Sequence, residues 1–273
     1  MGEMRQYRIG EYAKYLGVTP DLLKHYEDMG IIQSRRSESG YRYYPFHTTT
    51  RLIESIRLRN YGLTLREIKE ILSDHSLNNE EVEALIDRHL RRLEEEVQLD
   101  EALLEESAAF RDWRQSLEDR DWDWEIRRSE ERFFLPHTDR DNFLEDPRIY
   151  KILNSWMSYT PIVKSAMRVE ESGQITWGFV VSARNLKRLG LPLNEAVEPI
   201  PARKVFYCKY RARVLRMTEE ASERERHPAF QRLRALGLES EGSYYRTTVM
   251  PADWQQNSGY HYGCYTIPLR EQD

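Results

Sequence analysis

Apolar positions near the N-terminus recur at helical spacing over short stretches. The first short helix is predicted from four apolar positions: Ile9, Tyr12, Ala13 and Leu16. Gly17 breaks this pattern, and Thr19–Asp21 then supplies a capping hydroxyl, a proline and an acid near the positive helix end. These residues predict a second helix that ends at Gly30. Two short helices with a tight turn between them predict a helix-turn-helix.

A short β-ribbon and two further helices are predicted next. Polar turn residues over 34–40 precede the β-prone aromatic run Tyr41–Tyr44, a pattern typical of a β-ribbon, or wing. Helix is predicted again from Thr48 to about Asn60. The sequence Thr64–Glu67 is a capping box that opens one more helix, through Leu72.

Residues 79–118 carry one long amphipathic pattern. The apolar positions follow heptad spacing: Ile86, Leu90, Leu93, Val97 and Leu104. No proline or glycine occurs between positions 79 and 120, so a single helix of roughly 60 Å is expected. A single apolar stripe on so long a helix needs a partner, most simply a second copy of the chain. Packing against the rest of its own chain is the alternative.

The segment from residue 122 onward shows an α+β pattern. A strand is predicted over Trp122–Leu135, and a helix begins at Pro147. Strands over Ile162–Val169 and Ile175–Ser182 follow, joined by a turn at Gly173 that is typical of a hairpin.

The same order then repeats in the last seventy residues. A strand is predicted over Lys204–Val214, and a helix over Thr218–Leu236 with a kink at Pro228. Ser243–Met250 and Tyr260–Leu269 form a second predicted hairpin. Two tandem β-α-β-β units are expected to form one sheet with the helices on one side, which leaves the other face or the groove between the halves free to bind something.

Charge and composition narrow the class of protein. The chain of 273 residues has a net charge of −5, but residues 1–72 carry 12 basic and 9 acidic side chains. A small basic module on an acidic body is a reasonable footprint for nucleic-acid contact, although a solvated basic face is the commoner explanation. The two cysteines, Cys208 and Cys264, exclude a disulfide scaffold and a CxxC site.

No membrane or secretory segment is expected, and a cytoplasmic location is predicted. No uncharged apolar run reaches the roughly 18 residues that a transmembrane helix requires. The N-terminal residues lack the apolar stretch of a secretory signal.

The candidate DNA contacts lie on the second helix, the wing and the following helix. The helix that begins at Thr19 is the element expected to enter a major groove. Phosphate or backbone contacts are predicted for nine further side chains: Lys24, His25, Tyr26, Arg36, Tyr41, Arg42, Tyr43, Arg57 and Arg59.

Three stretches resemble the DNA-binding domain of MerR-family transcription regulators. They are Tyr7–Glu27, Gly40–Tyr44 and Leu58–Ile68. The family usually has Arg-Tyr-Tyr where this chain has Lys24-His25-Tyr26. The resemblance implies a multi-domain α and α+β protein with a winged helix-turn-helix domain over residues 1–75. It also implies an antiparallel coiled-coil dimerisation helix over 76–120 and an effector-binding domain over 121–273.

The resemblance also implies a mechanism of regulation. Such dimers bind pseudo-palindromic operators inside promoters that have an overlong spacer. The effector-bound dimer bends and underwinds the spacer, so that RNA polymerase can engage both promoter elements. The implied function is therefore that of a transcription activator, with no cofactor and no enzymatic activity.

The effector class is indicated by the last segment. Metal-sensing members carry cysteines around the dimerisation helix, but no cysteine precedes Cys208 here. The doubled β-α-β-β pattern and Tyr265–Leu269 are similar to BmrR-type drug sensors and gyrase-inhibitor-like domains. The resemblance implies a small aromatic or apolar effector. Its expected contacts are six aromatic residues: Trp156, Tyr159, Trp177, Tyr245, Tyr260 and Tyr262.

The charge of the ligand and two other functions stay open at this point. The drug sensors have a buried glutamate where this chain has Ser243–Thr248 without an acid, so neutral and anionic ligands remain possible. A gyrase-inhibitor-like domain with hydrolase activity could use Glu170 and Glu171 as bases, but a solvated hairpin tip is favoured for these adjacent acids. A DNA-bending protein that needs no ligand is the other alternative.

Overall fold

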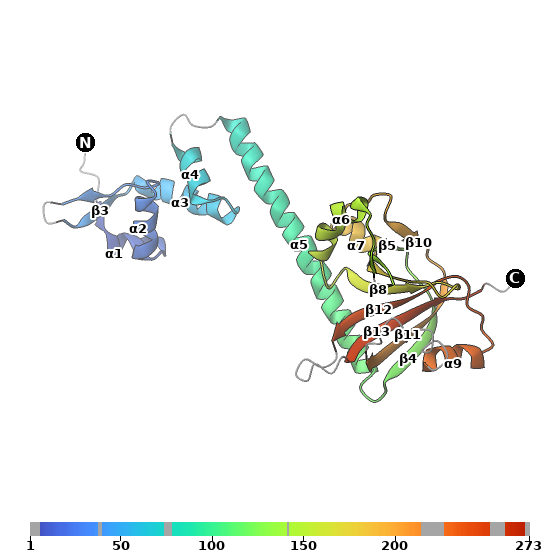
Figure 1. Ribbon diagram of the computed structural model, residues 1–273. Coiled ribbons are helices and arrows are strands. Elements are labelled where there is room, and N and C mark those ends of the chain that lie inside the picture. Colours follow the sequence, from blue (N-terminus) through green and yellow to red (C-terminus); the bar gives the residue numbers. More distant parts are fainter. Residues whose placement is uncertain are drawn as a thin grey trace. The chain divides into compact units, whose positions relative to one another are not determined.

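The computed structural model consists of two compact units, Met1–Val97 and Gln98–Asp273 (Figure 1). The structure describes residues 6–37, 40–73, 78–140, 142–213, 227–251 and 260–270. One long helix, α5 (Asn79–Ser116), contributes its first half to the first unit and its second half to the other. None of the helices in these described ranges is both long enough and apolar enough to span a bilayer.

The first unit contains the predicted helix-turn-helix and wing. Its elements are β1 (Gln6–Arg8), α1 (Ile9–Leu16), α2 (Pro20–Asp28), β2 (Arg35–Arg36), β3 (Arg42–Pro45), α3 (Thr48–Asn60) and α4 (Leu65–Leu72). Gly17 ends α1 in the left-handed region with φ 67°, and the Thr19 hydroxyl caps α2 by accepting from the amide of Leu22 at 3.1 Å. The capping box of α4 is also formed. The local signals therefore correctly predicted α1 to α4 in the described part of this unit.

A single core holds these elements together. Its fully buried side chains come from α2, β3, α3, α4 and the segments after α2 and α3: Leu23, Ile31, Ile32, Tyr44, Leu52, Leu63 and Ile68. Leu85 and Ile86 of α5 pack against this core, and His89 Nε2 lies 3.2 Å from a carboxylate oxygen of Glu67. The first half of α5 is therefore part of the unit.

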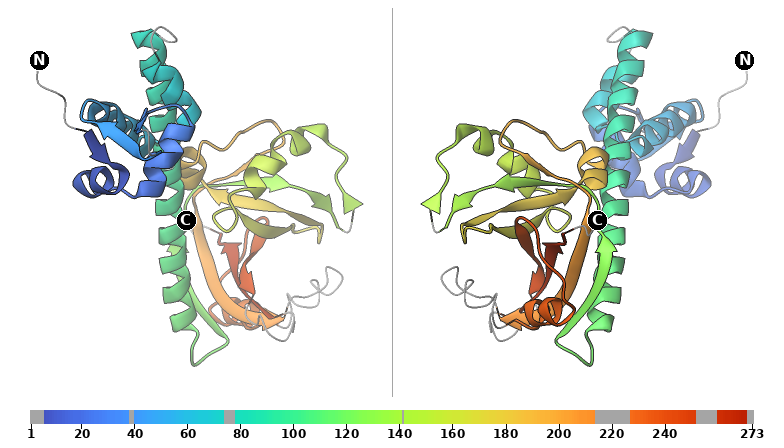
Figure 2. Two further views of the ribbon diagram at one scale, coloured as in Figure 1. Left: turned by 90° about the vertical axis from the view of Figure 1, so that its left-hand side faces the viewer. Right: turned by 90° about the vertical axis from the view of Figure 1, so that its right-hand side faces the viewer.

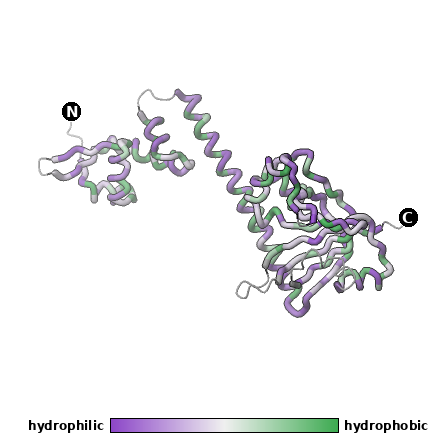
Figure 3. The backbone as a smooth tube through the Cα atoms, viewed as in Figure 1, coloured by the Kyte–Doolittle hydropathy of each residue, from purple (hydrophilic) through white to green (hydrophobic). Residues whose placement is uncertain are grey.

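Most of the predicted heptad positions on α5 remain exposed in the single chain. Ile86 is an exception, because it packs against the core of the first unit. Val97 and Leu104 are 52% and 70% exposed, and Leu90 and Leu93 are also exposed. Figure 3 shows α5 as hydrophilic along most of its length, with hydrophobic residues at intervals. An apolar stripe thus remains without a partner within the part of the chain that the structure describes.

The second unit is built on an eight-stranded antiparallel sheet with the order β10-β5-β9-β8-β12-β13-β11-β4. Its strands are β4 (Trp122–Arg128), β5 (Arg132–Pro136), β8 (Lys164–Val169), β9 (Ile175–Ser182), β10 (Glu198–Ile200), β11 (Lys204–Arg213), β12 (Tyr244–Pro251) and β13 (Tyr260–Pro268). A separate two-stranded ribbon pairs β6 (Thr138–Asp139) with β7 (Asn142–Phe143). The described residues of this unit also form the helices α6 (Pro147–Met157), α7 (Ala183–Arg188) and α9 (Pro228–Ala235).

The predicted tandem repeat is confirmed by the order of the strands. The first repeat, β5-α6-β8-β9, forms the run β5-β9-β8, and the second, β11-α9-β12-β13, forms β12-β13-β11. The two runs meet where β8 pairs with β12, with Tyr245 opposite Arg168. The sheet is thus two similar halves joined at its centre.

The single strand predicted over Trp122–Leu135 is wrong, since the structure has two strands there. β4 pairs with β11 at one edge of the sheet, whereas β5 pairs with β9 and β10 near the other edge. The chain leaves β4 at Ser129, whose amide donates to the carbonyl of Arg203 at 2.8 Å and whose hydroxyl accepts from the Arg203 amide at 3.1 Å. This anchor lets the chain cross between two different sets of partner strands.

The helix predicted over Thr218–Leu236 also differs, because α9 begins at Pro228 rather than bending there. His227 is extended, with φ −65° and ψ 135°, and its side chain caps the helix by accepting from the Ala229 amide. A residue before proline is disfavoured in helical conformation, and proline is well suited to the first helical position. The predicted positions up to residue 226 lie outside the described residues.

The helices α6 and α9 cover one face of the sheet. Leu135 and Val181 point toward α6, and Phe206 and Tyr265 point toward α9. On the opposite face, Cys264 packs with Trp113 and Leu117 at the C-terminal end of α5. Figure 2 shows this half of α5 running alongside the sheet. The second face of the sheet, which the sequence predicts to be free, is therefore partly covered by α5.

Candidate nucleic-acid interface and effector pocket

The exposed side of α2 carries part of the predicted DNA contact set. Thr19 is exposed at the N-terminus of the helix, followed by exposed Lys24 and His25. Lys24 Nζ lies 3.0 Å from a carboxylate oxygen of Asp21. The structure places the Tyr26 ring in the core, where only 5% of the residue is exposed. Tyr26 therefore supports the helix from within, which is a different position from the surface expected for a phosphate contact.

The wing carries a second exposed group. Arg36 and Tyr41 are exposed on the ribbon, while Arg42 and Tyr43 are half-buried at its base. Arg8 Nε donates to the Tyr43 hydroxyl at 3.3 Å, and the Arg8 guanidinium lies 5.4 Å from the centre of the Tyr41 ring. Arg8 of β1 therefore contacts both aromatic side chains of the wing.

Glu27 joins the wing to α2. Its carboxylate accepts hydrogen bonds from Ser34 Oγ at 2.6 Å, from Tyr44 Oη at 2.9 Å and from Arg42 Nε at 3.0 Å. Burial raises the pKa of Glu27, but the hydrogen bonds from Ser34 and Tyr44 and the charge of Arg42 outweigh it, so the pKa is lowered. The donors are up to 17 positions away in the sequence, so no local signal could identify this positioning role.

Arg57 and Arg59 are exposed near the end of α3, and each already makes a hydrogen bond within the chain. Arg57 Nη1 lies 3.1 Å from Glu54, and Arg59 Nη1 donates to the carbonyl of Leu63 at 2.8 Å. The exposed residues predicted to contact DNA therefore lie on α2 and on the wing, two elements that the hydrogen bonds of Glu27 join. The two arginines of α3 add basic charge to the same unit.

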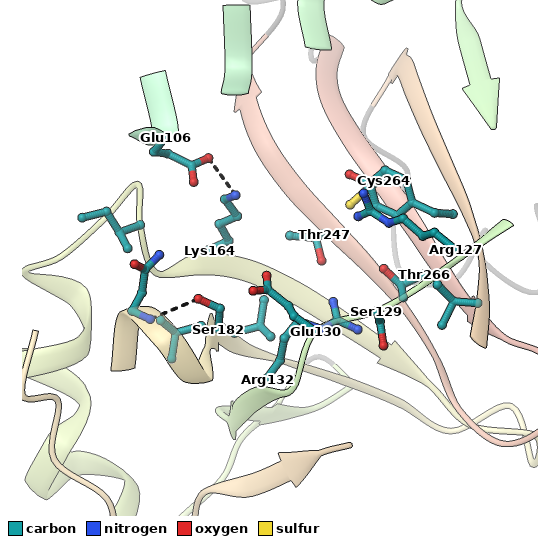
Figure 4. Close-up of a pocket in the computed structure, with 16 residues that line it drawn as sticks. Glu106, Arg127, Ser129, Glu130, Arg132, Lys164, Ser182, Thr247, Cys264 and Thr266 are labelled. Atoms are coloured by element: carbon teal, nitrogen blue, oxygen red, sulfur yellow. Dashed lines mark hydrogen bonds and ion pairs between the residues drawn. The ribbon is translucent and has the colours of Figure 1, made fainter. Parts of the chain in front are cut away.

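A pocket lies on the face of the sheet opposite α6 and α9, entirely within the second unit (Figure 4). Its volume is about 160 Å³. It is lined by Glu106, Arg127, Ser129, Glu130, Arg132, Ile162, Lys164, Val180, Val181, Ser182, Asn185, Val205, Tyr207, Thr247, Cys264 and Thr266. Strands from both halves of the sheet and the C-terminal half of α5 thus contribute to one site.

Three cationic side chains line this pocket, in different states of pairing. Lys164 Nζ makes an ion pair of 2.7 Å with Glu106 of α5. The Arg127 guanidinium lies 3.6 Å from the centre of the Tyr207 ring and 3.2 Å from Glu125. Arg132 makes no ion pair to any residue that the structure describes. The site therefore has a polar, positively charged part.

Three of the predicted ligand residues lie on the helix-covered face instead. Trp156 is fully buried on α6, and its indole nitrogen donates to the carbonyl of Pro192 at 3.0 Å. Tyr159 packs with the same cluster, and Trp177 packs against the cluster around α9. Side chains alternate along a strand, so the side occupied by Trp177 depends on register and cannot be read from the spacing alone.

Two predicted ligand residues lie on the pocket face, near the pocket. Tyr245 packs edge-to-face on Phe134, with ring centres 5.6 Å apart. Tyr262 packs edge-to-face on Phe110 of α5 at 5.5 Å. Tyr260 begins β13, but its side chain lies outside the described residues. Sequence reasoning missed the polar lining residues Arg132 and Thr247, because aromatic content was its only guide to the site.

Comparison with known proteins gives the family. Residues 7–75 match the model of the MerR helix-turn-helix family of regulatory proteins. The chain is 40% identical over 68 residues to the mercuric resistance operon regulatory protein of Bacillus cereus, covering 24% of this chain and 52% of that protein. It is 34% identical over 94 residues to the nodulation protein NolA of Bradyrhizobium sp. strain NC92, covering 34% of this chain but only 38% of NolA.

Longer coverage is found with two other proteins. An uncharacterised HTH-type transcriptional regulator of Pseudomonas aeruginosa is 33% identical over 113 residues, which is 40% of this chain and 80% of that protein. The EcmrR–DNA complex seen by cryo-electron microscopy is 14% identical, with a TM-score of 0.41, over 97% of this chain and all of that one. Together with the helix-turn-helix and wing described above, the sequence matches establish that the chain belongs to the MerR family of helix-turn-helix transcription regulators.

Proposed function

We propose that the chain is a dimeric, ligand-responsive regulator that binds a pseudo-palindromic operator within a promoter. The observation that carries this proposal is the joint exposure of Lys24 and His25 on α2 and of Arg36 and Tyr41 on the wing. An α-helix fits the major groove, and flanking basic side chains contact phosphates. The three functional parts would be residues 1–75 for DNA binding, 76–120 for dimerisation and 121–273 for the effector.

Dimerisation is supported by the apolar stripe on α5. Leu93, Val97 and Leu104 are exposed on a helix that no other described element covers at these positions. A second copy of the helix is the simplest partner for a stripe with heptad spacing. Two copies also match the two-fold symmetry of a pseudo-palindromic operator.

Effector control is supported by the pocket in the second unit. The pocket includes Glu106 of α5, the same helix that continues into the first unit. A small aromatic or apolar molecule bound there would act on this helix and thereby change the distortion of the promoter DNA. RNA polymerase would respond indirectly, through the altered spacing of the promoter elements.

The test is a mobility-shift titration of the full chain on the promoter fragment upstream of its own gene, at several salt concentrations. Arg36→Ala is expected to weaken binding by about 1–2 kcal/mol and to reduce the salt slope by about one unit per contact. Arg66→Ala is the matched control, because Arg66 is an exposed arginine of α4 outside the helix-turn-helix and wing. Failure of the unmodified protein to bind the fragment even at low salt would refute the proposal.

A further inference from the structure

We propose that the effector is a small organic anion whose carboxylate or similar acidic group binds Arg132, with a single ring or compact apolar body against the neighbouring strands. This inference rests on the proposed function and specifies its ligand. It differs from a site for cations, because the least solvated of the unpaired charged groups in the described lining is the guanidinium of Arg132.

Arg132 is a largely buried charge with no ion pair to a described residue, and the carboxylate of the exposed Glu130 acts on it only as a nearby charge. Its Nε is buried and has no hydrogen-bond partner, and the side chain makes no ion pair within the described ranges of the chain. Its guanidinium lies 5.6 Å from the centre of the Tyr245 ring. Burial lowers the pKa of Arg132, because removal from water disfavours the charged form. A buried charge is stabilised by an opposite charge with good hydrogen-bond geometry, which an anionic ligand provides.

A second polar group of the lining is also unsatisfied. Thr247 Oγ1 is buried without a hydrogen-bond partner among the residues that the structure places. Thr247 comes from β12, in the other half of the sheet from Arg132 on β5. A hydroxyl can donate to a carboxylate oxygen, and a guanidinium offers several donors in a fork. The two groups thus present donors from both halves of the sheet.

The acidic groups of the pocket do not form an equivalent site for a cation. Glu106 is already paired with Lys164 at 2.7 Å. Glu130 is exposed to solvent. Arg127 is stacked on Tyr207 and paired with Glu125. The lining therefore contains three cationic and two carboxylate side chains. Of these, Arg132 and Glu130 make no ion pair to a described residue, and Arg132 is the less exposed of the two.

The size of the pocket limits the apolar part of the ligand. Its volume is about 160 Å³, close to the roughly 150 Å³ engineered cavity that accommodates one benzene molecule. Val180 and Val205 supply apolar surface, and Tyr207 supplies an aromatic side chain. A monocyclic aromatic carboxylate has the right size and charge for this site.

The experiment compares three probes of nearly equal shape: benzoate, benzamide and benzamidine, which are anionic, neutral and cationic. Each is titrated into the full-length protein by calorimetry. Benzoate is expected to bind about tenfold more tightly than benzamide, as a charge-assisted hydrogen bond implies, and benzamidine least. Equal affinities, a preference for benzamidine or the absence of benzoate binding would overturn the proposal.

Substitutions of Arg132 separate a loss of ligand binding from a loss of folding. Arg132→Met should remove the preference for benzoate while leaving the thermal stability of the free protein equal or higher, because an apolar side chain replaces an unpaired buried charge. Arg132→Lys should retain part of the preference, since the charge is kept but the fork is lost. Arg128→Met is the matched control, because Arg128 is an exposed residue of β4 outside the pocket lining. A benzoate preference that persists in Arg132→Met would overturn the role of Arg132.

The same samples distinguish this inference from the proposed function. Mobility-shift binding to the promoter fragment is measured for the wild type and for Arg132→Met without probe. DNA binding with no benzoate preference would refute only the anionic ligand. Benzoate preference without DNA binding would refute the regulator and leave the anion site in place.

Discussion

Replacing Glu27 by glutamine tests whether one carboxylate couples the wing to the recognition helix. The substitution keeps the size of the side chain but removes its charge. Glu27 accepts from Ser34, Tyr44 and Arg42 within 3.0 Å. A glutamine oxygen can still accept from one or two of these donors, but Arg42 loses its counter-charge. The first unit should therefore lose stability without losing its fold.

The expected cost is about 2 kcal/mol. Hydrogen bonds to a charged group contribute about 1.5–3 kcal/mol, and neutral ones about 0.5–1.5 kcal/mol. Removing one partner of a fully buried ion pair costs about 3–5 kcal/mol. The Arg42 side chain is 31% exposed, so water can solvate it after the change, and the cost should be below that range. For a unit of this size, the melting temperature should fall by roughly 8–16 °C.

The effect should depend on pH in a defined direction. Because the pKa of Glu27 is lowered in the folded state from its ordinary value of 4.5, its contribution is present above that value. It is lost as the pH falls through the folded-state pKa. The stability difference between wild type and Glu27→Gln should therefore be largest near neutral pH and disappear in acid.

The assay is hydrogen exchange of the α2 and β3 amides in the full chain, together with thermal melting at several pH values. Glu54→Gln is the control, because Glu54 pairs with Arg57 at an exposed position, where such pairs contribute at most about 1 kcal/mol. Equal effects of the two substitutions, or a Glu27→Gln effect that does not change with pH, would refute the reasoning.

Three further substitutions address the rest of the chain. Val97→Glu places a charge in the apolar stripe of α5 and should shift the chain toward monomer in sedimentation equilibrium; an unchanged mass would exclude this stripe from the dimer. Gly178→Ala should destabilise the second unit by about 3 kcal/mol in urea unfolding, because the added Cβ meets the Leu135 carbonyl and lies 2.7 Å from the Phe134 ring. Trp177→Ala should cost about 3 kcal/mol in the same assay with unchanged operator affinity, and a variant of wild-type stability would show that the indole is not part of the core.

The helices of the first unit were predictable because their signals are local. The adjacent residues Thr19 and Pro20 start α2, and Thr64 and Glu67, three positions apart, form the capping box that starts α4. These side chains satisfy free amides at the helix ends, which depends only on the nearby sequence. The position of Tyr26 differed from the expectation because α2 has an exposed side and a core side, and Tyr26 was assigned to DNA contact together with the exposed Lys24 and His25.

The second unit was predictable in its repeat but not in its pairing. The first hairpin follows from its turn at Gly173, and the pairing of β12 with β13 follows from two β-prone runs that are close in the sequence. The division of residues 122–135 into β4 and β5 depends on two different partner strands far along the chain. No short-range pattern contains that information.

The sequence by itself determined the family, the order of helices and strands, the repeat in the second unit and the apolar stripe on α5, because each arises from neighbouring residues or from a linear motif. Only the tertiary structure decided that Glu27 joins α2 to the wing, that Trp177 lies on the helix-covered face of the sheet, and that Arg132 lines the pocket without an ion pair to any described residue. The contacts of Glu27 join residues up to 17 positions apart. For Trp177 and Arg132 the reason is strand geometry: alternate side chains point to opposite faces, so one residue of register decides between core and pocket.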